Sequence, residues 1–267
     1  MRTPHAVSLP KVLVPLLLIP LSLVFDTIPP IMNLLAVETS SQVLSVAIKK
    51  RGGKLRHATV QGYMKHAENL LPVIDRLLKN EKLKIGDIDA FLIDRGPGSF
   101  TGLRIGFATL KGFLAIFPKP CYGSYSLDVI AAAISPFRTS GVCENGHNTK
   151  QDLTVCLDAR RGKLYTRTYT HKKKGWSSTG PADVLSFEEM LRDTAAGSFV
   201  AGDGILKIDA RNMTAIPEKD WYPRASTLIE LFETKNPLIK KLSRPKDLLP
   251  VYLRRSEAEE RLSERKK

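Results

Sequence analysis

The chain has 267 residues, of which 43% are hydrophobic and 25% are charged, and its formal net charge is +14. This length and composition predict one large or two modest globular domains, and they exclude a small scaffold that depends on disulfide bonds or metal ions. The positive charge indicates either an acidic partner, with nucleic acid as the first choice, or a general enrichment in lysine for solubility. No aromatic residues are interleaved with the positive ones, as a platform for base stacking would require.

Three cysteines occur at irregular positions, namely Cys121, Cys143 and Cys156. An odd number without a CxxC spacing argues against a disulfide framework and against a structural zinc site. The body of the chain is therefore typical of a reducing compartment, and we expect a cytoplasmic protein without a membrane partner.

The first 31 residues differ from the rest of the chain. Arg2 and Lys11 precede an apolar stretch, Val12 to Phe25, that two prolines interrupt. This stretch is too short for a spanning helix, and no small-residue cleavage site follows it. We predict that Met32 is the true start and that residues 1–31 are an upstream extension; a membrane anchor is the alternative.

From residue 32 onward, the spacing of apolar residues predicts alternating strands and helices. The first strands form a meander, because polar turns at 38–41 and 51–54 separate three short runs. Pro72 falls inside the first predicted helix, so this helix either begins irregularly or bends. In chain order, the N-terminal half contains strands at 34–37 and 43–48, a third strand after residue 54, a helix at 67–78, a strand at 88–93, a helix at 100–117, a strand ending near residue 122 and a helix at 126–133.

A polar stretch at 137–152 leads into the second half. There, Ser186 and Glu189 form a capping box that predicts a short helix. Strands that alternate with helices in two successive halves indicate an α/β protein of two related subdomains. The C-terminal half contains strands at 153–157 and 164–169, a strand beginning at 199, a helix at 225–232 and an extended piece at 249–254. The predicted divisions are an N-terminal subdomain at 32–137, a C-terminal subdomain at 138–254 and a charged tail at 255–267.

The most informative motif is a block of twelve residues from Arg95 to Gly106. It begins with a Gly-Pro-Gly turn after an apolar strand, and it continues into an apolar helix. Glycines allow close approach of a backbone, and Ser99 or Thr101 can cap the helix. A strand, a glycine turn and a helix N-terminus together predict a place where an anion or a partner's backbone comes close.

Five segments occur in the order found in the TsaB family, and the twelve-residue block is the most specific of them. The segments are Leu34 to Ser40, Arg95 to Gly106, Asp158 to Gly162, Gly202 to Gly204 and Pro250 to Arg254. The chain resembles this family from Met32 to about Arg254. The resemblance implies a fold like that of the actin, hexokinase and Hsp70 ATPases, with mixed sheets flanked by helices in two subdomains.

The same resemblance implies a role in forming threonylcarbamoyladenosine, the modified tRNA adenosine next to the anticodon. The chain would be a non-catalytic scaffold or activator that binds the catalytic TsaD subunit, with a TsaE-like ATPase in the larger complex. It would contact tRNA mainly indirectly, and a homodimer through the same helices is expected when TsaD is missing. An independent ATP-binding or ATP-hydrolysing enzyme of the same fold is the alternative, and direct tRNA binding through the positive charge is a third possibility.

The catalytic relatives carry a His-x-x-x-His pair, which places two imidazoles on one helix face where they can hold a metal ion. In this chain, Ser126 and Ile130 stand at the corresponding positions. His66 lies beside Glu68, but no second histidine follows at helical spacing. We therefore expect no metal ion.

Nucleotide binding in ATPases of this fold uses a hairpin that holds phosphate and magnesium. The first predicted turn has a carboxylate and hydroxyls but no glycine for close approach, and the Gly-Asp-Gly segment fits either a second phosphate loop or a tight turn. The candidate contacts are Glu38, Thr39, Gly202, Asp203 and Gly204. We expect no resident cofactor and no catalytic residue.

In the family, the helices that correspond to 67–78 and 100–117 pack against TsaD. Gly102 and Gly106 lie four residues apart, so they share one helix face and predict clearance for a partner's helix. The alternative is that both helices form the chain's own core. The predicted partner-binding residues are Leu70, Leu71, Ile74, Gly102, Leu103, Gly106 and Phe107.

Overall fold

The structure is a computed structural model, and it describes residues 31–62, 65–134, 152–172, 175–244 and 247–254. These residues belong to one compact unit. Residues 1–30 of the predicted extension at 1–31, the subdomain boundary at 137–138 and the tail from residue 255 lie outside the described residues. Within the described ranges, no helix is both long enough and apolar enough to span a membrane.

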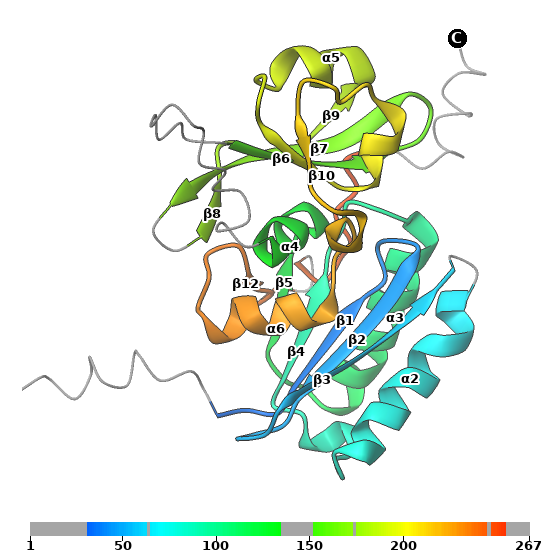
Figure 1. The fold of residues 1–267 in the computed structure, drawn as a ribbon. Coiled ribbons are helices and arrows are strands. Elements are labelled where there is room, and N and C mark those ends of the chain that lie inside the picture. Colours follow the sequence, from blue (N-terminus) through cyan, green and yellow to red (C-terminus); the bar gives the residue numbers. More distant parts are fainter. Residues whose placement is uncertain (1–30, 63–64, 135–151, 173–174, 245–246, 255–267) are drawn as a thin grey trace, which may run out of the picture. The chain divides into compact units, whose positions relative to one another are not determined.

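Six strands form the first sheet, in the order β12-β5-β4-β1-β2-β3 (Figure 1). The predicted meander is confirmed, because β1, β2 and β3 pair antiparallel in sequence. β4 pairs in parallel with β1, and β5 pairs in parallel with β4. At the other edge of the sheet, β12 pairs antiparallel with β5. The strands are β1 (Leu34–Glu38), β2 (Val43–Lys49), β3 (Leu55–Gln61), β4 (Ala90–Asp94), β5 (Cys121–Ser124) and β12 (Lys240–Lys241).

Helices cover both faces of the first sheet, as Figure 1 shows. Successive side chains of a strand point to opposite faces. Leu35 and Val37 therefore pack with the apolar residues of α2 and α3, whereas Leu34 and Ala36 pack with those of α4 and α6. Burial on both faces explains why β1 is an unbroken apolar run. The helices are α2 (His66–Asn80), α3 (Phe100–Ile116), α4 (Ser126–Ala133) and α6 (Ala225–Glu233).

The second sheet has the order β11-β10-β6-β7-β8, with β9 paired to β7. Its short helix begins with the predicted capping box, because Ser186 Oγ accepts from the Glu189 amide and the Glu189 carboxylate accepts from the Ser186 amide. The elements are β6 (Asp152–Asp158), β7 (Lys163–Lys172), β8 (Gly175–Ser178), β9 (Asp183–Ser186), α5 (Phe187–Asp193), β10 (Phe199–Ala201) and β11 (Thr214–Ala215).

α4 and α6 connect the two halves of the chain. Leu127 and Ile130 of α4 belong to the core of the second sheet, while Val129 belongs to the core of the first. α6 lies late in the sequence but packs against the first sheet, and the amide of Ala225 donates to Ser45 Oγ of β2 at 3.1 Å. Part of the predicted C-terminal subdomain thus packs with the N-terminal sheet, and the boundary itself stays a prediction.

The twelve-residue block holds the turn between β1 and β2. Gly98 and Gly102 lie against the backbone of this turn: a Cβ atom on Gly98 would stand 2.2 Å from the Ser40 carbonyl oxygen, and one on Gly102 would stand 2.0 Å from that of Thr39. Such distances leave room for a hydrogen atom only. The Ser99 amide donates to the Ser40 carbonyl oxygen at 2.6 Å, which fixes the turn in register with the start of α3.

Ser99 caps α3, as one of the two sequence alternatives predicted. Its Oγ accepts from the Gly102 amide at 3.2 Å. Thr101 is exposed and lies in the first turn of the helix. Gly96 has a φ of +92°, which a residue with a side chain rarely adopts.

The prediction that Gly102 and Gly106 leave clearance for a partner's helix is wrong in this structure. Both glycines are buried, and a Cβ atom on Gly106 would stand 2.5 Å from Thr39 Oγ1. The spacing of four residues does place them on one helix face, but the chain's own turn occupies that face. On α3, the glycine with open space around it is Gly112.

Two alanine substitutions in α3 test this packing. Gly102→Ala should lower the free energy of unfolding by about 2 kcal/mol or more, because the new methyl group overlaps the Thr39 carbonyl. Gly112→Ala should raise it by about 0.5 to 1 kcal/mol, because alanine favours a helix and nothing lies within 4 Å of the added atom. Urea denaturation of both variants measures the two changes. Equal effects of the two substitutions would contradict the close contact at Gly102.

Candidate functional site

Two carboxyl groups come together where the central strands of the first sheet end. Glu38 is the last residue of β1, and Asp94 is the last residue of the neighbouring parallel strand β4. Ser126, the first residue of α4, lies beside them. The carboxyl ends of parallel strands are the usual place for a ligand site in α/β proteins. Here all three side chains are buried.

Ser40 connects the two carboxyl groups. Glu38 Oε1 accepts from the Ser40 amide at 2.5 Å and from Ser40 Oγ at 2.6 Å. Ser40 Oγ also lies 3.3 Å from Asp94 Oδ2. Asp94 Oδ1 accepts from the Gly96 amide at 2.8 Å and from Ser126 Oγ at 2.7 Å. The four side chains therefore form a buried chain of hydrogen bonds.

Burial makes it costly to ionise both acids. It raises the pKa of Glu38 well above its usual range, and the nearby charge of Asp94 raises this pKa further. Burial also raises the pKa of Asp94 to about 7, although hydrogen bonds from Gly96, Ser126 and Ser40 oppose the shift. Ser40 Oγ has one hydrogen to donate, so its contacts with both carboxyl groups are best satisfied when the pair holds a proton. We infer that the pair shares a proton near neutral pH.

The positions of the family's histidine pair are used for packing. Ser126 donates to Asp94, and Ile130 is buried in the core of the second sheet. Among the described residues, no group of three or more His, Cys, Asp or Glu side chains could hold a metal ion. His66 is buried at the start of α2. The expectation that the chain binds no metal stays a prediction.

The first candidate loop packs closely against the twelve-residue block, and the absence of a bound nucleotide stays a prediction. The space beside Thr39 and Ser40 is filled by the glycines of the twelve-residue block. Glu38 accepts hydrogen bonds from its own loop, so its carboxylate is turned inward. Thr39 is buried as well.

The Gly-Asp-Gly segment forms a tight turn after β10. A Cβ atom on Gly202 would stand 2.1 Å from the Cys156 carbonyl oxygen, and one on Gly204 would stand 2.9 Å from the same oxygen. Asp203 Oδ1 accepts from the Asp158 amide at 3.0 Å. These contacts hold the turn against β6, and burial raises the pKa of Asp203.

The two candidate loops approach the same tyrosine. Gln42 in the first loop donates to the hydroxyl of Tyr222. Burial raises the pKa of Tyr222, and the charge of Asp203 in the second loop raises it further. The fold thus brings both loops toward Tyr222, although the glycines of the second loop pack against Cys156.

A buried ion pair that the sequence interpretation missed joins α4 to β7. Arg167 Nη1 lies 2.9 Å from Asp128 Oδ1 and 3.0 Å from Oδ2, and the Tyr169 hydroxyl donates to the same Oδ1 at 2.6 Å. Burial raises the pKa of Asp128, and the bonds from Tyr169 and Arg167 oppose that shift. An aspartate inside an apolar helix is the one signal in the sequence that points to this pair. It ties the helix that follows the first sheet to the second sheet.

Six of the seven predicted partner-binding residues are buried within the chain. Leu71 is the exception, with 53% of its surface exposed. The alternative that the two helices form the chain's own core is therefore correct for most of these side chains. The buried residues are Leu70, Ile74, Gly102, Leu103, Gly106 and Phe107.

An apolar groove lies next to Leu71. It has a volume of about 710 Å³ and runs between the second half of α2, the segment that follows it and Phe113 of α3. Three lysines contribute to its lining. The lining residues are Leu71, Ile74, Asp75, Leu78, Lys79, Lys82, Leu83, Lys84, Ile85 and Phe113.

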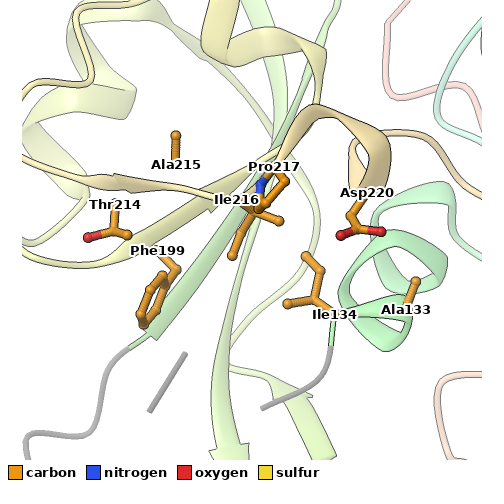
Figure 2. Close-up of a pocket in the computed structure, with 8 residues that line it drawn as sticks. All are labelled: Ala133, Ile134, Phe199, Thr214, Ala215, Ile216, Pro217 and Asp220. Atoms are coloured by element: carbon orange, nitrogen blue, oxygen red, sulfur yellow. The ribbon is translucent and has the colours of Figure 1, made fainter. Parts of the chain in front are cut away.

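Figure 2 shows a smaller pocket of about 430 Å³ between the end of α4 and the β10–β11 edge of the second sheet. Its lining is largely apolar, and Thr214 and Asp220 supply the side-chain oxygens. Asp220 lies 3.9 Å from Arg224. None of the residues predicted from the sequence to be functional lines this pocket.

Asp94→Asn tests the shared proton. Folding raises the pKa of Asp94 to about 7 from the value of about 4 expected when unfolded. The stabilising contribution of Asp94 is therefore complete below pH 4 and is lost as the pH rises through 7. Asparagine keeps the acceptor for Gly96 and Ser126 and replaces the acidic proton with an amide. The variant's free energy of unfolding should gain roughly 1 to 3 kcal/mol over that of the wild type between pH 5 and pH 8.

Denaturation curves at several pH values measure this difference. Asp75→Asn is the matched control, because Asp75 is exposed on α2 and pairs with Lys79 at 2.7 Å. A gap between Asp94→Asn and the wild type that stays constant from pH 5 to pH 8 would rule out the shared proton.

A family model described as TsaD, tRNA N6-adenosine threonylcarbamoyltransferase, matches residues 61–222, more than half of the chain. The chain is 29% identical over 142 residues to the tRNA threonylcarbamoyladenosine biosynthesis protein TsaB of Haemophilus influenzae, covering 53% of this chain and 56% of the relative. It is 24% identical over 210 residues to the TsaB protein of Buchnera aphidicola, covering 76% of this chain and 94% of the relative. The alignment thus spans just over half of the first relative and nearly all of the second.

A solved structure shows the same architecture. YeaZ from Pseudomonas aeruginosa is 25% identical to this chain and superposes with a TM-score of 0.63, over 83% of this chain and 100% of that one. Two mixed sheets flanked by helices give the actin and ATPase-like fold that the sequence resemblance implied. The chain therefore belongs to the family that the threonylcarbamoyltransferase model describes and, within it, to the TsaB proteins.

Proposed function

We propose that this chain is a non-catalytic subunit that binds a TsaD-type catalytic subunit during formation of threonylcarbamoyladenosine in tRNA. The relatives named for this biosynthesis support the pathway. The observation that carries the non-catalytic role is the buried chain from Glu38 to Ser126. Both carboxyl groups are buried, and Glu38 Oε1 and Asp94 Oδ1 accept hydrogen bonds from the chain itself, which supports a structural role for the pair. The chemistry then belongs to the partner.

The outer surfaces of α2 and α3 support the docking of a partner. Leu71 is 53% exposed and Ile116 is 72% exposed, and together they leave apolar area in contact with water. Gly112 and Ala108 are exposed and small, so a second helix could approach α3 closely on this side. The partner surface proposed is thus the outer face of these helices, defined by Leu71, Ala108, Gly112, Ile116 and the adjoining groove.

The lysines of the groove fit an acidic edge on the partner. Lys79, Lys82 and Lys84 line it together with a single acid, Asp75. Complementary charge steers two proteins into encounter and fixes their orientation. In the absence of the catalytic subunit, the same apolar face would be covered by a second copy of this chain, which gives a homodimer. A TsaE-like ATPase would join the larger complex.

Leu71→Asp tests the proposed surface. Placing a charge at the centre of an apolar contact should weaken the complex with the TsaD-type subunit by about 10-fold or more. Leu206→Asp is the matched control, because Leu206 is 69% exposed and lies at the turn after β10. Both substitutions are at exposed sites, so both should leave the free energy of unfolding nearly unchanged. Co-purification and isothermal titration with the partner measure the affinity.

Sedimentation of the chain alone gives a second measurement. The wild type should sediment as a dimer, and Leu71→Asp should sediment as a monomer. A complex that forms equally well with Leu71→Asp would remove the outer face of α2 from the interface. Gly106→Arg is not a suitable probe, because the side chain would collide with Thr39 and disturb the fold.

An independent ATP-dependent enzyme is the alternative, and the approach of both candidate loops to Tyr222 is the observation that favours it. We expect no hydrolysis above background when the purified chain is given ATP with magnesium or zinc. The reason is that Glu38 and Asp203 both accept hydrogen bonds from the chain's own backbone. Turnover that disappears in Asp203→Ala would overturn the non-catalytic assignment.

A further inference from the structure

Two segments that are distant in the sequence meet at the start of α3. The ring of Phe100, the first residue of α3, lies with its centroid 4.7 Å from that of Tyr252, at an angle of 37°. The guanidinium carbon of Arg104 lies 3.8 Å from the centroid of the Phe100 ring. The phenyl ring of Phe100 therefore contacts both the guanidinium of Arg104 and the phenol ring of Tyr252.

This group is exposed, and the backbone beneath it is held in place. Arg104 is exposed, and 42% of the surface of Tyr252 is open to solvent. The Val251 amide donates to the Arg95 carbonyl oxygen at 2.7 Å, and the Val251 carbonyl oxygen packs onto Gly96, where a Cβ atom would stand 3.0 Å from it. A ring that is already fixed loses little conformational freedom when a ligand stacks on it.

Further arginines continue from Tyr252 toward the second sheet. Arg254 Nη1 donates to the carbonyl oxygens of Ala159 and Arg160, at 2.5 and 2.7 Å. The turn that it contacts carries Arg160, with 64% of its side chain exposed, and the exposed Arg161. Within the described part of the chain, Asp158 lies beside them: its Oδ1 accepts from the Arg160 amide at 2.8 Å, and its Oδ2 lies 3.9 Å from the Arg160 guanidinium. We call Arg104, Phe100, Tyr252, Arg254, Arg160 and Arg161 the arginine strip.

We propose that the arginine strip binds unpaired nucleotides of a tRNA, with a base stacked on Tyr252 and phosphates held by the guanidinium groups. Single-stranded nucleic acid is bound by this combination of aromatic faces and positive charge. All four cations of the strip are arginines, which pair with phosphate through two parallel bonds and stack on bases, unlike lysine. An acidic protein would satisfy the charges but would not need an exposed aromatic ring.

The proposal rests on the proposed function where it names tRNA as the nucleic acid. The net charge of +14 favours any polyanion, so charge alone does not select the strip. The proposal that the arginine strip binds tRNA directly departs from the expectation that this chain contacts tRNA mainly indirectly. The sequence shows no interleaved aromatic residues, because Phe100 and Tyr252 become neighbours only in the folded chain.

Fluorescence anisotropy of a labelled, unmodified tRNA transcript with the full chain tests this proposal. Tyr252→Ala should weaken binding by about 5- to 100-fold, and Tyr252→Phe should restore most of the affinity, because base stacking depends on the ring. Arg104→Ala should weaken binding and lower the slope of log affinity against log salt by about one unit. Arg76→Ala is the matched control, because Arg76 is an exposed arginine on α2 outside the strip, and it should leave the affinity within about two-fold.

Three results would overturn the proposal. The first is that the chain alone fails to bind the transcript. The second is that Tyr252→Ala binds the transcript as tightly as the wild type does. The third is that the strip variants bind tRNA normally and lose the TsaD-type partner instead. The last result would assign the strip to a protein interface. Leu71→Asp separates the two ideas, since it should lose the partner and keep its affinity for tRNA. Loss of partner binding in Leu71→Asp without any tRNA binding would leave the proposed function standing and refute the strip.

Discussion

The turn between β1 and β2 approaches the beginning of α3 so closely that only hydrogen fits on Gly98 and Gly102. That contact fixes the height of α3 above the sheet, and it places Ser40 between Glu38 and Asp94. Any side chain on these glycines would push the turn away and remove the Ser40 hydroxyl from both carboxyl groups, which leaves Glu38 without a hydroxyl partner. An unsatisfied buried acid costs far more than the hydrogen bond it loses. The glycines and the carboxyl pair are therefore one structural unit.

This unit also fills the carboxyl ends of the central strands β1 and β4 with buried side chains. In α/β proteins, ligands enter the crevice at the carboxyl ends of parallel strands. Here β1 and β4 end in acids that face each other, and Ser126 at the start of α4 closes the group from the side. Glu38 Oε1 and both oxygens of Asp94 have hydrogen-bonding contacts within this cluster, which holds the centre of the sheet together.

The sequence predicted the positions of most helices and strands well, but it predicted less well which parts of the chain pack against one another. Helical periodicity places α2, α3, α4 and α6 within a few residues of their observed bounds, because each helix buries a regular apolar face. The strands β8, β9, β11 and β12 were missed, since pieces of two to four residues at sheet edges carry no periodic pattern. The spacing of Gly102 and Gly106 identifies a shared face, but it does not say whether a partner or the chain itself lies there.

The same limit applies to the candidate site. Asp94 follows an apolar strand and precedes a glycine turn, and that position could have marked it as a residue at a strand end. Its bond with Ser126 and the pair of Asp128 with Arg167 depend on contacts between segments that are far apart in the sequence. Hydrophobic periodicity reports only local structure, so it predicts neither the Asp94–Ser126 bond nor the Asp128–Arg167 pair. Leu70 and Leu71 differ by one position, and the fold alone decides that one is core and the other is surface.

Three of the family's segments meet around the first turn of α3. The segment that ends in Arg254 contacts Arg95 and Gly96 through Val251 and reaches the turn at Asp158 to Gly162 through Arg254. α3 therefore serves three separate contacts: its glycines seat the first turn, Phe100 receives Tyr252, and Gly112 lies open on the outer face. Because the inward, terminal and outward surfaces of α3 use different residues, its core packing and the two contacts that we propose, with nucleic acid and with a partner, can be tested separately in a single helix.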